Sequence, residues 1–242
     1  MKPKHFHIIA CHVLWREICF FSARMPHTFN FTFLQQGLHD TPEELRKELQ
    51  QAVDNVNNQC DYILVGYGLC SNGIVGIRAG NFPLVVMRGH DCITFFLGSM
   101  QRYRQLFDAN PGIYWYTPGW IETGKTPMPG KERFDKLYQE FRDKFGEENA
   151  DYLMEVEKQW IRDYHTAAYS DLGVGEREKY ITYTKQCADY LNWEFQHVNG
   201  NPQLLKDFLR GNWDDERFLI VPPGHRIVAS HNDKIIDVRL NE

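Results

Sequence analysis

The chain has 242 residues and a formal net charge of −5, so it lacks the clustered basic face through which many proteins bind nucleic acid. No apolar stretch approaches the roughly 20 residues that cross a bilayer. Six cysteines, with no apolar signal segment behind the first residues, fit a reducing cytoplasm. We therefore expect a cytoplasmic protein without nucleic-acid or membrane partners.

Strand-like and helical patterns alternate along the first half of the chain. Apolar, β-rich runs lie at about 6–10, 29–34, 61–66 and 84–88. Between the second and third runs, Thr41 can cap a helix that begins at Pro42. Leu45, Leu49 and Val53 then recur at helical spacing. A strand, helix, strand order predicts parallel pairing with a right-handed crossover.

The middle of the chain changes composition after a short strand at about 113–117. Residues 123–130 are rich in Gly, Pro and Thr, and the stretch from Lys131 to about Ser170 is charged with a helical pattern. The α/β pattern then resumes from about 175 to 221. We predict a single α/β domain over residues 1–242, three-layered with a mostly parallel sheet, carrying a helical insertion at about 123–170.

Three cysteines follow three of the predicted strands. They are Cys11, Cys70 and Cys92. Because the carboxyl ends of neighbouring parallel strands meet at one edge of a sheet, we expect the three thiols to lie together. His39 follows the run 29–34, and His90 lies two residues before Cys92. Thiolate and imidazole groups at one edge indicate a soft-metal site, with zinc favoured.

The sequence alone does not decide which of these residues would bind the metal directly. No Cys-x-x-Cys motif occurs, so the metal hypothesis depends on the fold. His90 and Cys92 would point apart in a helical turn, so only one of them is expected to bind metal directly, and His39 or His90 would complete the shell. Asp91 is either a second-shell partner of an imidazole or a helix cap. For Cys70, the alternative is a buried structural cysteine in the glycine-rich turn 66–76.

Three further side chains follow predicted strands and are expected to form the wall of a ligand cleft. Tyr67 and Trp120 would supply aromatic surface, and Arg88 would supply a fork for an acidic group. The alternatives are that Trp120 seals the core and that Arg88 pairs with a structural acid. A small-molecule ligand is the expected occupant.

Several short motifs of the chain resemble the family known as domain of unknown function 1638. They are Ala10-Cys11, Leu38-His39, Tyr67-Gly68-Leu69-Cys70, His90-Asp91-Cys92 with Gly98-Ser99, and Thr117-Pro118-Gly119-Trp120. The resemblance covers the first half of the chain well and the charged middle poorly. It implies a setting in anaerobic bacteria and methanogenic archaea, near corrinoid-dependent methyltransferase systems, and makes a corrinoid protein a candidate partner.

The leading functional hypothesis is a zinc-binding protein of anaerobic one-carbon or methyl-transfer metabolism. With one open position, the metal would act as a Lewis acid in a methyl or small-group transfer. An iron–sulfur cluster on the three thiols is the alternative cofactor. Two other classes remain open, namely a metal-free racemase that uses two cysteines as acid and base, and a non-catalytic accessory protein of a corrinoid methyltransferase system.

Overall fold

A computed structural model describes residues 2–57, 59–123 and 132–241 of the chain. The chain divides into two compact units, which are described separately below. The first comprises Met1–Arg104, Leu172–Gly175 and Asn199–Glu242, and the second comprises Gln105–Asp171 and Glu176–Val198. Helix α4 (Met100–Ala109) spans the boundary between them. None of the described helices is both long and apolar enough to cross a membrane.

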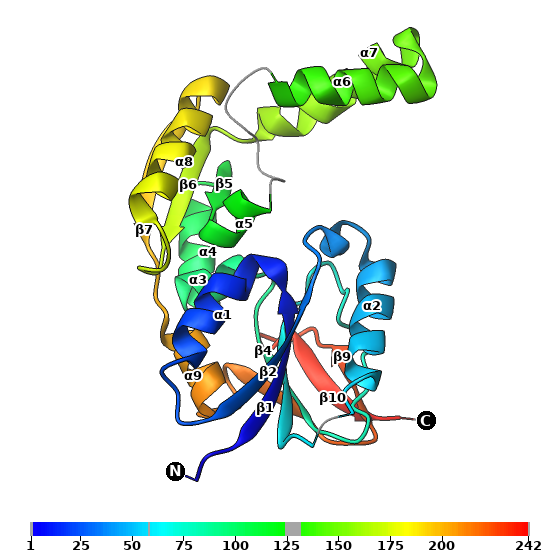
Figure 1. The fold of residues 1–242 in the computed structure, drawn as a ribbon, viewed down its shortest axis with the longest axis vertical. Helices are drawn as coiled ribbons and strands as arrows, with labels where there is room; N and C mark the ends of the chain where they lie inside the picture. The colour runs from blue at the N-terminus through cyan, green and yellow to red at the C-terminus, as the bar shows by residue number, and fades with distance from the viewer. Residues whose placement is uncertain (1, 58, 124–131, 242) are drawn as a thin grey trace. The chain divides into compact units, whose positions relative to one another are not determined.

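The first unit is organised around a five-stranded sheet with the strand order β2-β1-β3-β4-β8 (Figure 1). The first four of these strands run parallel, and β8 is antiparallel to β4. Their bounds are β1 His5–Cys11, β2 Thr28–Leu34, β3 Tyr62–Gly66, β4 Leu84–Met87 and β8 Phe218–Val221. The central strands are buried on both faces, as expected for a parallel sheet between helices.

Helices lie on both faces of this sheet. Helix α1 (Trp15–Ser22), which follows the 3₁₀ turn His12–Leu14, lies on one side of the strands, and α2 (Pro42–Asp54) lies on the other (Figure 1). Leu45, Leu49 and Val53 of α2 are buried, because their spacing places them on one side of the helix. A second 3₁₀ turn, Leu38–Asp40, precedes α2.

The end of the chain completes the first unit. Helix α3 (Ile93–Leu97) follows β4, and α9 (Gln203–Arg210) contacts both α1 and α3. The C-terminal strands β9 (His225–Ala229) and β10 (Ile236–Leu240) form an antiparallel pair.

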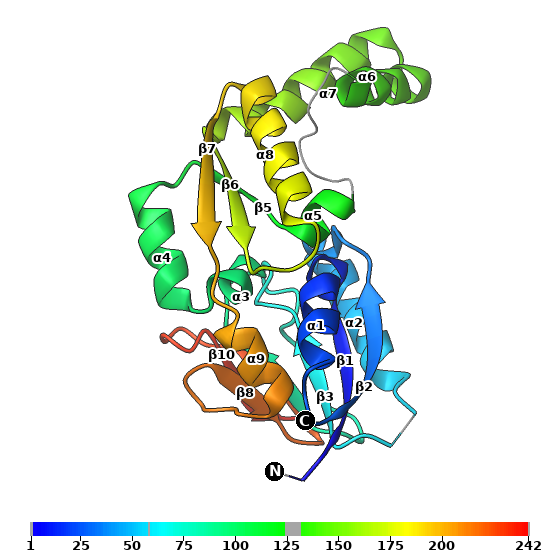
Figure 2. The same ribbon diagram turned by 60° about the vertical axis from the view of Figure 1, so that its left-hand side comes forward.

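The second unit has its own three-stranded sheet, in the order β5-β6-β7. Strands β5 (Ile113–Tyr116) and β6 (Thr166–Asp171) pair in parallel, and Figure 2 shows β7 (Glu194–Asn199) running in the same direction as β6. The helices of this unit are α5 Pro118–Glu122, α6 Glu132–Phe145, α7 Glu147–Gln159 and α8 Arg177–Leu191, with a 3₁₀ turn at Trp160–Asp163.

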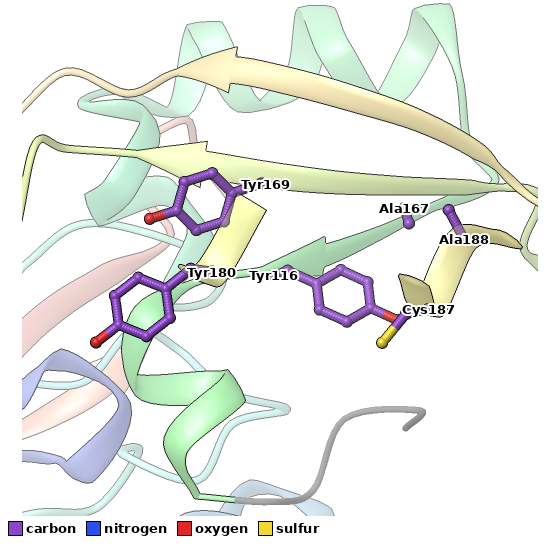
Figure 3. Close-up of a cluster of buried hydrophobic side chains, with 6 residues drawn as sticks. All are labelled: Tyr116, Ala167, Tyr169, Tyr180, Cys187 and Ala188. Carbon is purple, nitrogen blue, oxygen red and sulfur yellow. The ribbon is translucent and has the colours of Figure 1, made fainter. Parts of the chain in front are cut away.

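Tyrosine rings form much of the core of the second unit (Figure 3). Tyr116 and Tyr169 come from the sheet, while Tyr180 and Cys187 come from α8, and all four are buried. The phenol of Tyr116 is hydrogen-bonded to the thiol of Cys187. The phenol of Tyr180 donates to the carboxylate of Glu122, so these two buried phenols have the polar partners that such groups usually find.

The predicted α/β class and mostly parallel sheet are confirmed. The expected strands at 6–10, 29–34, 61–66 and 84–88 correspond to β1, β2, β3 and β4. One segment differs, because the charged helical stretch ends before Thr166, and all six residues of β6 are buried in a strand. The proposed insertion at about 123–170 thus contributes a strand as well as α6 and α7, while residues 124–131 lie outside the described part of the chain.

Candidate functional site

The three predicted thiols follow the carboxyl ends of three adjacent parallel strands in the first unit. Cys11 is the last residue of β1, Cys70 lies in the turn after β3, and Cys92 lies just before α3 in the loop after β4. Strand β3 pairs with both β1 and β4, so these loops leave the sheet at the same edge. Cys11 is buried, and the other two cysteines are partly exposed.

The thiols are close enough to influence one another electrostatically. Burial, followed by the charges of Asp91 and Cys11, raises the pKa of Cys70 to about 12. Burial is also the main cause that raises the pKa of Cys92, followed by Asp91, Cys11 and Cys70. Each negative charge in this group makes the next one more costly. At neutral pH, Cys70 and Cys92 are therefore protonated.

Tyr67 and Asp91 belong to the same cluster. Tyr67 is buried, its hydroxyl has no hydrogen-bond partner among the described residues, and burial followed by the charges of Cys11 and Cys70 raises its pKa. Asp91 accepts hydrogen bonds from the phenol of Tyr103 at 3.0 Å and from the backbone N–H of Ile93 at 2.9 Å. Burial nevertheless raises the pKa of Asp91.

Two backbone hydrogen bonds join the loops that carry Cys70 and Cys92. The N–H of Leu69 donates to the Gly89 carbonyl at 2.8 Å, and the N–H of Cys70 donates to the His90 carbonyl at 2.9 Å. Gly68 makes this approach possible, since a Cβ there would lie 2.9 Å from the Gly89 oxygen and from the Asp91 Cα.

The turn that carries Cys70 has an unusual backbone conformation. Cys70, Ser71 and Asn72 have φ values of 46°, 55° and 65°, so three consecutive residues other than glycine lie in the left-handed region. L-residues adopt this conformation at a cost of roughly 1–2 kcal/mol each. Arg46 of α2 supports the turn, because its guanidinium donates to the carbonyls of Val75 at 2.6 Å and Asn72 at 3.0 Å.

A comparison with protein-family models identifies the family of this chain. The model of the family described as "Protein of unknown function (DUF1638)" matches residues 33–209, which is more than half of the chain and includes both of these loops. The chain belongs to this family. No curated protein and no solved structure matches it.

The two candidate histidines of this DUF1638 chain lie near the surface. The Nε2 atom of His39 lies 3.3 Å from Oδ1 of its neighbour Asp40, and its side chain is 36% exposed. His90 is exposed, and its charge lowers the pKa of Asp91 against the larger effect of burial. Within residues 2–57, 59–123 and 132–241, no group of three or more His, Cys, Asp or Glu side chains already has an arrangement that could hold a metal ion.

Arg88 binds groups of the protein itself. This agrees with the alternative in which Arg88 pairs with a structural acid. Its buried guanidinium donates to the carbonyls of Asp215, Phe218, Lys234 and Ile236, and it pairs with the Asp215 carboxylate at 3.3 Å. These donors link β4 to the segments around β8 and β10. An incoming acid would have to displace several of these hydrogen bonds.

Trp120, the remaining wall candidate, belongs to the second unit. It lies on α5, where its backbone N–H donates to Oγ1 of Thr117 at 3.3 Å and so caps the start of the helix. The ring is half-buried.

The second unit contains a polar cluster that the sequence did not reveal. The buried carboxylate of Asp171 accepts two hydrogen bonds from Arg177, at 2.9 Å and 2.6 Å to Oδ2, and Nε2 of His197 lies 3.0 Å from the same oxygen. The ring of Tyr169 stacks on His197. Asp171 ends β6 and is followed by Leu-Gly-Val-Gly. A carboxylate at the end of a strand before such a turn is a weak sequence signal for a polar cluster, because the same sequence also suits an ordinary turn.

Proposed function

We propose that Cys11, Cys70 and Cys92 form a binding site for a soft divalent metal ion, with zinc as the favoured metal. The observation that carries this proposal is the grouping of three thiols with Asp91, in which the charges of Asp91 and Cys11 raise the pKa of Cys70 and of Cys92. A protein gains nothing in stability from grouping four acidic side chains in this way. A cation among them would stabilise the thiolate forms, which the neighbouring acidic groups otherwise make costly.

Metal binding at this cluster would be coupled to proton release. Because Cys70 and Cys92 are protonated at neutral pH, each must lose its proton to bind the metal as a thiolate. Tyr67, whose buried hydroxyl lies near Cys11, would then be placed to donate a hydrogen bond to the Cys11 sulfur. The apparent affinity should therefore increase with pH.

The left-handed turn gives Cys70 a way to move into a metal-binding position. Zinc needs sulfur atoms at about 2.3 Å, so the thiols must close around the ion. Release of the strained residues Cys70, Ser71 and Asn72 would favour such a movement. His39, His90 or a water molecule would occupy the fourth position, and an open position would allow Lewis-acid chemistry.

The reaction itself remains a prediction. Methyl or small-group transfer in one-carbon metabolism, with a corrinoid protein as partner and a small methylated ligand as substrate, follows from the family resemblance and fits thiolate-bound zinc. A metal-free two-cysteine racemase needs one thiol as a base at neutral pH, and the raised pKa of Cys70 and Cys92 weighs against it.

The test is an anaerobic titration of the purified chain with Co²⁺ and Zn²⁺, followed by absorption and by proton release in a weakly buffered solution. We expect one equivalent to bind with a cobalt–thiolate absorption band, and we expect Zn²⁺ to displace cobalt. A brown protein with bound iron and sulfide after anaerobic purification would instead identify an iron–sulfur cluster.

Single variants assign the ligands. Cys11→Ser, Cys70→Ser and Cys92→Ser should each weaken binding at least about tenfold and reduce proton release. The matched control is Cys60→Ser, because Cys60 is also partly exposed and has a pKa raised by burial, but does not belong to the cluster. Binding that persists in all three cluster variants, or the absence of any binding to the unaltered chain, would rule the site out.

A further inference from the structure

A strand edge of the first unit carries none of the residues that usually protect such edges. Strand β2 is the outermost strand of the five-stranded sheet, and it pairs with β1 along its whole length, from Thr28 to Leu34 (Figure 2). Its sequence, Thr-Phe-Asn-Phe-Thr-Phe-Leu, contains no charged residue and no proline. Proteins usually protect such edges with charged residues, prolines or bulges.

The outward-facing backbone groups of β2 can be assigned from its pairing with β1. The N–H of Thr28 donates to the Lys4 carbonyl at 2.9 Å, so Thr28 faces β1. Because successive residues of a strand alternate between its two edges, the N–H and C=O groups of Phe29, Phe31 and Phe33 face away from β1. They form a row of donors and acceptors available to another strand.

The side chains of the same three residues form an aromatic ladder. The rings of Phe29 and Phe31 are stacked 6.1 Å apart, and those of Phe31 and Phe33 are stacked 5.9 Å apart. Phe31 at the centre is 40% exposed. One residue set thus provides both free backbone groups and an apolar surface, which is the combination that strand addition uses.

We propose that β2 pairs with β2 of a second copy of this chain, in antiparallel orientation about a two-fold axis at Phe31. In this register Phe31 lies opposite Phe31 of the second copy, and Phe29 lies opposite Phe33. Each pair of outward-facing residues exchanges two backbone hydrogen bonds. The aromatic ladders of the two copies then join into one row across a continuous sheet.

A second copy suits this edge better than an unrelated strand for a chemical reason. The strand is neutral, and Phe29 and Phe33 lie two residues on either side of Phe31, so antiparallel self-pairing places ring against ring. No like charges are brought together, although the whole chain carries a net charge of −5. Isologous pairing of this kind is the commonest route to a homodimer.

The first experiment measures mass against concentration by sedimentation equilibrium for the full chain. We expect a reversible dimer, and we expect Phe31→Lys to weaken dimerisation by roughly tenfold or more because two lysines would face each other across the axis. Ile220→Lys is the matched control, since Ile220 is 43% exposed on β8, the opposite edge strand. This variant should dimerise like the unaltered chain.

Amide hydrogen exchange keeps the proposal testable if Phe31→Lys folds poorly. The amides of Phe29, Phe31 and Phe33 should become protected as the concentration of the unaltered chain rises, while those of Asn30 and Thr32 stay protected at all concentrations. A chain that remains monomeric near millimolar concentration with these three amides unprotected would overturn the proposal. So would a dimer whose affinity Phe31→Lys leaves unchanged.

Discussion

The phenol of Tyr67 lies near the thiol of Cys11 at the edge of the first unit's sheet, and the phenol of Tyr116 is hydrogen-bonded to the thiol of Cys187 in the core of the second unit. The chemical pairs are alike, but only the first stands among further thiols and a carboxylate. A substitution at Tyr67 can therefore be compared with the same substitution at Tyr116, to distinguish a tyrosine of a binding site from one that only packs in a core.

Replacing Tyr67 with Phe removes the buried hydroxyl near Cys11, which could donate to a thiolate there, and keeps the ring. We expect Tyr67→Phe to weaken Co²⁺ binding by roughly tenfold, because the phenol stabilises the thiolate. The stability of the metal-free protein should change by about 1 kcal/mol or less. Tyr116→Phe is the matched control, and it should leave metal affinity unchanged. Equal metal affinities of the two variants would contradict this role of Tyr67.

The pH dependence of stability follows from the raised pKa of Cys70. Its ordinary value is 9.0 and its value in the folded protein is about 12, so the unfolded chain releases this proton more readily. The stability that the neutral thiol contributes is complete below pH 9.0 and is lost as the pH rises towards about 12. Denaturant unfolding across this range, without metal, measures the loss.

Asp91 contributes to that pH dependence through its negative charge. Asp91→Asn should lower the pKa of Cys70, so the loss of stability above pH 9.0 should become smaller. Alkylation of Cys70 by iodoacetamide at pH 8 should become faster, since more thiolate is present. Asp61→Asn is the control, because Asp61 raises the pKa of Cys60 instead. An unchanged alkylation rate in Asp91→Asn would show that the carboxylate does not act on Cys70.

A glycine substitution in the strained turn should stabilise the protein, whereas most substitutions by glycine destabilise it. Ser71 is exposed and has a φ of 55°, so Ser71→Gly should relieve the steric conflict and stabilise the protein by about 0.5 kcal/mol. Gly76→Ala, at a φ of 93°, should destabilise it. Thermal unfolding measures both variants. A loss of stability in Ser71→Gly would mean that the turn is not strained at this residue.

The structural environment of Arg88 predicts a large effect without any ligand. Arg88→Met leaves the carbonyls of Lys234 and Ile236 without their buried donor, and we expect a loss of about 3 kcal/mol in the free energy of unfolding. Arg102→Met, at an exposed position on α4, should cost little. If Arg88→Met were as stable as the unaltered chain, the guanidinium would be available for an acidic ligand after all.

The position of the three cysteines after the carboxyl ends of adjacent strands could be predicted from the sequence alone. The apolar runs before Cys11, Cys70 and Cys92 indicate buried strands, and the helix after Pro42 indicates a parallel crossover. Parallel strands connected in this way place their carboxyl ends at one edge. Local patterns were sufficient for this placement, because the strands are continuous apolar runs and the helix after Pro42 has helical apolar spacing.

The tertiary structure decided the features that depend on distant residues. Thr166–Asp171 is rich in small and polar residues with weak strand preference, and it becomes a strand only because β5 pairs with it. The guanidinium of Arg88 donates hydrogen bonds to backbone carbonyls between residues 215 and 236, which lie far along the chain. The left-handed turn at Cys70 is held by Arg46 from another element. In each case the deciding energy comes from contacts between segments distant in sequence, which no local pattern contains.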